Sequence, residues 1–196
     1  MESEPRRVIR SAIALPVLAS AALIALGIDQ FSKFLVVTTM REGEVIPVLG
    51  PVLQWNFVRN SGAAFSLASG MTWIFTILAV IVAVVIVWFS RRIHSLSWAI
   101  LLGLLLGGVL GNLTDRLFRE PGFGRGEVVD FISMPWMLPA IYNMADASIV
   151  VSMGLFLLIT LRGVRLDGSV EARGATTAPD ADSNGTVELA AADPAH

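Results

Sequence analysis

Two aspartates occupy unusually apolar parts of the chain. Asp130 lies inside the segment 128–132, and Asp146 stands near the start of a long apolar run. Carboxylates in or beside hydrocarbon are costly, so they indicate a function. Two carboxylates a few Å apart cannot both ionise cheaply, and one keeps its proton. Such a pair supplies a base for a water that attacks a carbonyl and an acid for the leaving amine.

The composition excludes several other kinds of chemistry. The 196 residues include no cysteine, which rules out disulfides, thiolate metal sites and a cysteine nucleophile. The two histidines are His94, beside two arginines, and His196 at the C-terminal end. A histidine triad or a zinc site is therefore not expected. We predict no metal and no organic cofactor, and we expect no nucleic acid partner.

Further polar residues recur at helical spacing near the two aspartates. Asn112, Asp115 and Arg116 share one helix face by their i,i+3 and i,i+4 spacing, and Asn143 precedes Asp146 by three residues. Antiparallel packing of the two helices would bring these faces together, with Asp130 between them. Two alternatives remain: hydrogen bonds that only hold helices together, and, for Asp130, an acid in an interfacial loop.

Asp29 and Lys33 form an i,i+4 pair with the acid on the N-terminal side, which is the better orientation. We interpret them as a structural pair whose lysine extends toward the interface; the alternative is part of a proton or ion path. Asn60 lies in the segment 56–66, where small residues allow close backbone approach. An ordinary turn before the next helix is the other interpretation of that segment.

The elements that carry these residues are predicted to cross a membrane. The chain is 55% hydrophobic and 15% charged, with a mean hydropathy of +0.71. Four apolar segments are each long enough to span about 30 Å of hydrocarbon: 11–37, 71–89, 97–117 and 141–161. The first is longer than the apolar part of a cleaved signal peptide, so we expect a retained helix. We predict an all-α integral membrane protein with one four-helix domain over 11–162.

Arginines in the loops favour a topology with both termini in the cytoplasm, with 1–10 as a cytoplasmic N-terminus. The segments 38–70 and 118–140 would then lie outside the cell membrane. The first of these has β-prone stretches separated by turn residues, which predicts a small extracytoplasmic sheet over about 40–70. Residues 163–196 have few large apolar side chains after about 167, so we expect a disordered cytoplasmic tail.

Five short motifs, in this order, resemble those of bacterial lipoprotein signal peptidase, the signal peptidase II family. They are Asp29-Gln30 with Lys33, Asn60-Ser61-Gly62-Ala63-Ala64-Phe65-Ser66, Gly111-Asn112-Leu113-Thr114-Asp115-Arg116, Val128-Val129-Asp130-Phe131 and Asn143-Met144-Ala145-Asp146. The likeness covers about residues 12–162. Tyr142 stands where the family commonly has phenylalanine.

The resemblance implies an aspartic endopeptidase of the bacterial inner membrane. It would cleave diacylglyceryl-modified prolipoproteins on the N-terminal side of the lipidated cysteine, with Asp130 and Asp146 as catalytic residues. Substrate-contacting roles would fall on Asn60, Asn112, Arg116 and Asn143, while Asp29, Lys33 and Asp115 would be structural. The family likeness also implies a β-cradle, a short helix or loop over the site before Asp130, and inhibition by globomycin-like cyclic peptides. The site would lie near the extracytoplasmic face.

Two other functions are compatible with intramembrane acids. A small proton-coupled transporter would use Asp29, Lys33, Asp130 and Asp146 as a relay, but the segment 71–89 carries no ionisable residue. A non-catalytic assembly factor would use the asparagines only to join helices. Neutralising either aspartate would then leave lipoprotein maturation intact.

Overall fold

The computed structural model describes residues 11–62, 72–137 and 139–169. It contains four helices and four short strands. The helices are α1 (Ser11–Thr39), α2 (Thr72–Ser90), α3 (Leu96–Phe118) and α4 (Met144–Leu161). The strands are β1 (Val45–Pro47), β2 (Gln54–Asn60), β3 (Val128–Ser133) and β4 (Ile141–Tyr142). All four helices are long and apolar enough to cross a membrane, which confirms the predicted fold class.

Helix α3 is the centre of the bundle and packs against α1, α4 and α2. Glycines every four residues let α1 approach it closely, as small residues do in membrane helix pairs. A Cβ on Gly107 would stand 2.5 Å from the Ala22 carbonyl oxygen, and one on Gly111 would stand 2.5 Å from Asp29 Oδ2. The close approach at Gly111 brings the Asp29 carboxylate against α3.

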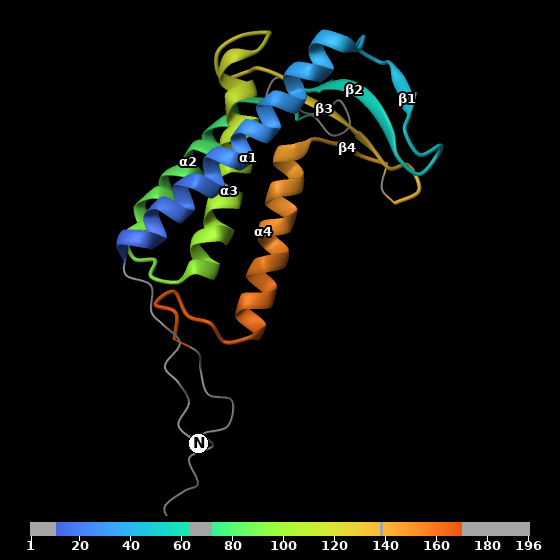
Figure 1. The fold of residues 1–196 in the computed structure, drawn as a ribbon. Coiled ribbons are helices and arrows are strands. Elements are labelled where there is room, and N and C mark those ends of the chain that lie inside the picture. The colour runs from blue at the N-terminus through green and yellow to red at the C-terminus, as the bar shows by residue number, and fades with distance from the viewer. Residues whose placement is uncertain (1–10, 63–71, 138, 170–196) are drawn as a thin grey trace, which may run out of the picture.

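The strands form one antiparallel sheet in the order β1-β2-β3-β4. The sheet extends sideways from one end of the bundle, on the side of α4 (Figure 1). Alternate residues of β3 face opposite sides, so Val129 and Phe131 are buried with Phe57 and Val36 in an apolar cluster. Asp130 therefore faces the other side of the sheet.

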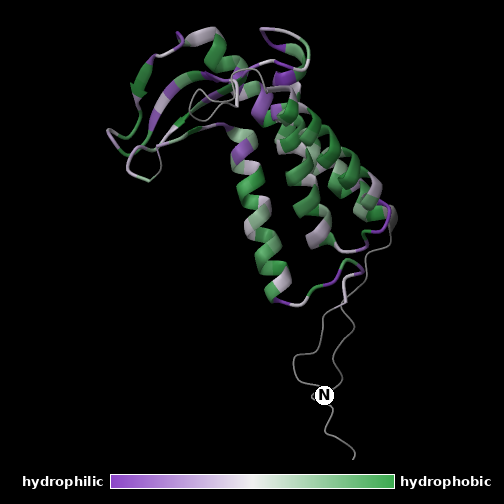
Figure 2. Cartoon of the chain, turned by 180° about the vertical axis from the view of Figure 1, so that it is seen from behind, coloured by the Kyte–Doolittle hydropathy of each residue, from purple (hydrophilic) through white to green (hydrophobic). Residues whose placement is uncertain are grey.

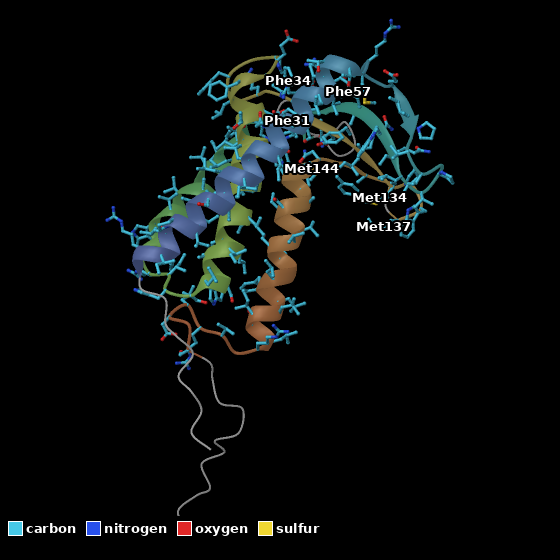
Figure 3. The ribbon with its side chains drawn as sticks, viewed as in Figure 1. Phe31, Phe34, Phe57, Met134, Met137 and Met144 are labelled. Atoms are coloured by element: carbon cyan, nitrogen blue, oxygen red, sulfur yellow. The ribbon has the colours of Figure 1, made fainter. Side chains whose placement is uncertain are left out.

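The outer surface of the helices is apolar, as expected for a lipid-facing surface (Figure 2). Phe31 and Phe34 lie near the sheet end of α1, where they are 64% and 60% exposed (Figure 3). Met144 begins α4 directly below the sheet in the same view. In water such exposure would be costly, whereas in a bilayer these side chains remain in hydrocarbon.

The structure corrects two local expectations and decides between the two forms of a third. The fourth helix begins at Met144 rather than 141, because Ile141 and Tyr142 pair with β3. The segment around Asp130 is a strand, which we had not predicted. Residues 119–127 form turns without a helix, so the expected helix or loop before Asp130 is a loop.

The start of the expected disordered tail is also folded. Trp98 Nε1 donates to the Val164 carbonyl oxygen at 3.0 Å, and the His94 backbone N–H donates to the Leu166 carbonyl oxygen. Residues 163–169 therefore pack against the beginning of α3. The rest of the expected tail, 170–196, lies outside the described residues.

Candidate active site

Asp130 is held on β3 by two asparagine amides. Its register opposite Val58 places it beside the end of β2, where Asn60 lies. Asn60 Nδ2 donates to Asp130 Oδ2 at 2.8 Å, and Asn143 Nδ2 donates to Asp130 Oδ1 at 2.6 Å. The residue is only 2% exposed. Each carboxylate oxygen thus has one neutral donor, and no ion pair involving Asp130 is formed among the described residues.

Asp146 is positioned by the beginning of α4. Asn143 caps this helix, with its side chain accepting from the Asp146 backbone N–H at 3.0 Å. Asp146 Oδ2 accepts in return from the Asn143 backbone N–H at 3.2 Å, which completes a capping box. Asn112 Nδ2, from α3, donates to Asp146 Oδ1 at 2.9 Å. The first turn of a helix also favours a negative charge.

Asn143 connects the two aspartates. Its side-chain amide group contacts Asp130 and also donates to Asn112 Oδ1 at 3.1 Å, while its backbone contacts Asp146. The residue is fully buried. The structure thus brings Asp130 and Asp146 to the two sides of one asparagine, from a strand and a helix that meet at β4.

Burial raises the pKa of Asp130 to about 6, and the nearby charge of Asp146 acts in the same direction. The amide donors of Asn60 and Asn143 oppose this shift without cancelling it. A carboxyl group with this pKa exchanges its proton close to neutral pH. That property suits proton transfer in both directions.

Beside this pair lies a group of charged residues, Asp29, Lys33, Asp115 and Arg119, which we call the ion cluster. Lys33 Nζ is 2.8 Å from both Asp29 Oδ2 and Asp115 Oδ2, and Arg119 Nε is 2.6 Å from Asp115 Oδ1. The Asp29, Lys33 and Asp115 side chains are fully buried. Our expectation that Lys33 extends toward the interface is therefore wrong, because its ammonium group is enclosed between two carboxylates.

The ion cluster accepts hydrogen bonds from the backbone next to each of the two aspartates. Asp29 Oδ1 accepts from the backbone N–H of Ala145, and Asp115 Oδ2 accepts from that of Val129. These residues immediately precede Asp146 and Asp130. Lys33 Nζ also donates to Asn112 Oδ1 at 3.0 Å, which directs the Asn112 amide group toward Asp146. The cluster therefore fixes the backbone on both sides of the site.

Among the described residues, two buried polar atoms near the aspartates have no hydrogen-bond partner: Arg116 Nη1 and the Tyr142 hydroxyl. The Arg116 guanidinium lies over the Phe75 ring at 5.3 Å and interacts with the charges of Asp130, Asp115 and Asp146. Buried donors without partners are rare in proteins and call for an explanation. Arg116, which we expected in the site, is therefore near both aspartates, and its Nη1 group is available to donate a hydrogen bond.

Sequence reasoning missed Arg119 and Gln30. Arg119 follows Asp115 by four residues, and this spacing was sufficient to predict the pair. Gln30 donates to Asp29 Oδ2 and to the Gly111 carbonyl oxygen, a contact that spacing alone does not predict. The segment 56–66 was expected to allow close backbone approach, but its part from residue 63 onward lies outside the described residues. Within the described part of the chain, no cluster of acids and histidines is arranged to hold a metal ion.

Two carboxylates held at one end of four helices that are long and apolar enough to cross a membrane are the arrangement expected of a membrane hydrolase of the aspartic type. The family model described as Signal peptidase (SPase) II matches residues 21–162. The chain therefore belongs to the signal peptidase II family of aspartic peptidases, as the sequence motifs predicted.

Similar proteins agree with this assignment. A lipoprotein signal peptidase of Leifsonia xyli is 56% identical over 168 residues, which cover 86% of this chain and 77% of that protein. One of Streptomyces coelicolor is 47% identical, with 79% and 74% covered. A bacterial membrane enzyme structure solved by the in meso method at 1.9 Å resolution aligns with a TM-score of 0.67 and 28% identity. That alignment covers 81% of this chain and 99% of the solved one.

Proposed function

We propose that this protein removes the signal peptide from diacylglyceryl-modified prolipoproteins by hydrolysing the peptide bond on the N-terminal side of the lipidated cysteine. The observation that carries the proposal is the attachment of Asp130 and Asp146 to the two sides of Asn143. Family membership supports a peptidase, and the carboxylate pair provides both an acid and a base. No other described group is needed for the reaction.

In the proposed reaction, the ionised carboxylate takes a proton from water while the oxygen of that water attacks the scissile carbonyl carbon. The protonated carboxyl donates to the carbonyl oxygen, giving a neutral tetrahedral diol. Collapse of the diol re-forms the carbonyl, breaks the C–N bond and sends a proton to the leaving amine. The steps are the same whichever of the two carboxyls starts ionised, so neither starting role is assigned to a single residue.

The neighbouring polar residues would have different roles. Arg116 has a buried donor with no partner in the described part of the chain, which suits a hydrogen bond to a substrate carbonyl. Asn60 donates a hydrogen bond to Asp130, and Asn112 donates one to Asp146. Asn143 was expected to contact substrate, but its complete burial favours positioning of the two carboxylates instead. A globomycin-like cyclic peptide would inhibit by occupying the space between the aspartates.

The location of the site fits a lipid-linked substrate. Diacylglyceryl chains stay in the bilayer, so the scissile bond must be cleaved where a helix end meets the membrane surface. Asp130 is on β3 and Asp146 is in the first turn of α4. Figure 1 shows the sheet at this end of α4. We propose that this end faces outward from the cytoplasmic membrane and that both termini are cytoplasmic, as the arginine distribution indicates.

The structure disfavours the transporter alternative. A relay requires polar groups spread across the bilayer, whereas those described here gather at the sheet end of α1, α3 and α4. Helix α2 contains no ionisable residue. The polar groups therefore suit chemistry at one membrane surface better than a path across it.

The test is cleavage of a synthetic prolipoprotein peptide by the purified full-length protein in lipid nanodiscs. Mass spectrometry in H2 18O should show cleavage just before the lipidated cysteine, with one 18O atom in the released signal peptide. The matched peptide with an unmodified cysteine should be cleaved at least tenfold more slowly. Cleavage at another bond, or equal rates for both peptides, would contradict the proposed substrate.

A further inference from the structure

A second candidate site lies at the end of the bundle opposite the aspartates. A cavity of about 720 Å³ opens between α2 and α3, which is within the size range of ligand sites. Its apolar walls include Val84, Val87 and Trp88 from α2 and Leu106 and Leu110 from α3. We call this cavity the α2–α3 groove. Neither the carboxylate pair nor the ion cluster contributes a residue to it.

Two arginines stand at the mouth of the groove. Arg91 and Arg92 directly follow α2 and line the same cavity. The ion pairs of the described residues do not include either arginine. The Arg92 guanidinium lies over the Trp88 ring at 5.1 Å. Stacking uses the face of a guanidinium and leaves its N–H edge available for an anion.

The surroundings of this mouth are also positive. The described segments 90–96 and 161–169 contain Arg91, Arg92, Arg162 and Arg165, against a single acid, Asp167. A basic, partly stacked pair at a helix end matches a phosphate group in charge and in hydrogen-bond geometry. The mouth therefore favours an anionic group over a neutral one.

The depth of the groove matches a lipid chain. Leu106 stands ten residues after the start of α3 at Leu96, which corresponds to about 15 Å at the helical rise per residue. Half of a hydrocarbon core of about 30 Å has the same thickness. A chain that enters beside Arg91 and Arg92 would reach Leu106 near the middle of the bilayer. The walls along this path are apolar.

We propose that the α2–α3 groove binds an anionic phospholipid, with its phosphate on Arg91 and Arg92 and one acyl chain between α2 and α3. Basic pockets between membrane helices bind phospholipid head groups in this way. The groove offers both parts of such a site: two arginines for the phosphate and an apolar channel for one chain. The site is independent of the catalytic proposal and can be tested whether or not that proposal holds.

The test is native mass spectrometry of the full-length protein with dioleoylphosphatidylglycerol or dioleoylphosphatidylcholine, which have identical acyl chains. The anionic lipid should bind more tightly. Arg91→Gln with Arg92→Gln should weaken its binding roughly tenfold to thirtyfold, from the usual contribution of two basic residues. The control pair Arg41→Gln and Arg125→Gln removes the same charge from exposed positions at the other end and should leave binding unchanged.

A second variant tests the apolar part of the site. Val84 is 61% exposed, so Val84→Trp should fold normally while filling the groove, and should weaken phosphatidylglycerol binding with both arginines intact. Glycerol phosphate, which has no acyl chain, should not compete. Equal binding of both lipids, or full binding by the double arginine variant, would overturn the proposal. Displacement of the lipid by a synthetic signal-peptide helix would also overturn it, because the groove would then be a substrate site.

Discussion

The ion cluster and the carboxylate pair occupy the same end of the bundle, yet their charges are compensated differently. In the ion cluster, Lys33 lies between two carboxylates at 2.8 Å, and Arg119 adds a second cation on Asp115. Asp130 and Asp146 accept hydrogen bonds from asparagine amides and backbone N–H groups. One group is held by ion pairs, and the other by neutral donors.

This difference suggests separate roles: the ion cluster supports the backbone of the site, and the carboxylate pair is suited to proton transfer. Ion pairing gives each of the two buried carboxylates a cationic partner, which suits a fixed acceptor for the N–H groups of Ala145 and Val129. The neutral donors on Asp130 orient its carboxylate but offset only part of the cost of burying the charge, so the pKa of Asp130 stays raised. The site also retains two unpartnered polar atoms, on Arg116 and Tyr142. In the proposed reaction, the ion cluster provides the rigid support and the carboxylate pair carries out the proton transfers.

The largest effect on stability is expected when the ion cluster loses its central cation, Lys33. Lys33→Met should lower the free energy of unfolding by about 3–5 kcal/mol, because two buried carboxylates would lose a partner. Thermal unfolding in detergent, followed by tryptophan fluorescence, measures this change. Arg125→Met, at an exposed position, is the control and should unfold like the wild type.

The double variant Asp29→Asn with Lys33→Met sharpens the result. Lys33→Met leaves Asp29 without its cationic partner, whereas Asp115 keeps Arg119. Neutralising Asp29 as well should recover part of the loss, with a coupling energy of about 1–3 kcal/mol. Strict additivity of the two changes would show that the ion cluster is not a coupled unit. The contrast with the carboxylate pair would then fail.

The second prediction concerns how the stability of the protein depends on pH through Asp130, which accepts hydrogen bonds from two asparagine amides. The pKa of Asp130 is about 6 in the folded protein, against about 3.9 in an unfolded chain. The folded state holds this proton more tightly, so its contribution to stability is present below pH 4 and is lost as the pH rises to 6. The full cost above pH 6 is at most about 3 kcal/mol.

Asp130→Asn has no such proton, so its stability relative to the wild type should rise between pH 4 and pH 7. Melting temperatures of both proteins across this range provide the measurement. Glu120→Gln removes an acid whose side chain is 90% exposed, and its curve should run parallel to that of the wild type. A parallel curve for Asp130→Asn would mean that burial does not raise the pKa of Asp130.

The smallest effect is expected at Tyr142. Its hydroxyl is buried and no described residue bonds to it, and an unsatisfied polar atom destabilises the folded state. Tyr142→Phe should therefore leave the free energy of unfolding unchanged or raise it by up to about 1 kcal/mol. Tyr142→Leu, which also removes the ring, should lower it. Destabilisation by phenylalanine would show that the hydroxyl has a partner that stabilises the fold.

Much of this arrangement could be predicted from the sequence. Hydropathy located the four helices to within about three residues, because a bilayer-spanning helix needs a long apolar run. Helical spacing placed Asn112, Asp115 and Arg116 on one face of α3, and Asn143 with Asp146 on α4. The motifs correctly indicated the family.

The remaining features depend on contacts between distant segments. The apolar, β-branched segment around Asp130 suited a strand, but only pairing with β2 and β4 decides it. Lys33 has one acidic partner at helical spacing and another, Asp115, on α3. Spacing along one helix cannot reveal the second partner, so the lysine was wrongly expected at the interface. The asparagine bridge between Asp130 and Asp146 likewise depends on three elements meeting.

The most direct test of the central claim compares cleavage of a lipidated precursor peptide by the wild type, Asp130→Asn and Asp146→Asn in the same nanodiscs. Both variants should fold, as shown by melting curves, and each should lose about a thousandfold or more in kcat, because either change removes one member of the acid and base pair. Asp167→Asn, at an exposed position on the opposite end, should retain wild-type activity. A folded Asp130→Asn or Asp146→Asn protein that cleaves within tenfold of the wild-type rate would contradict the account.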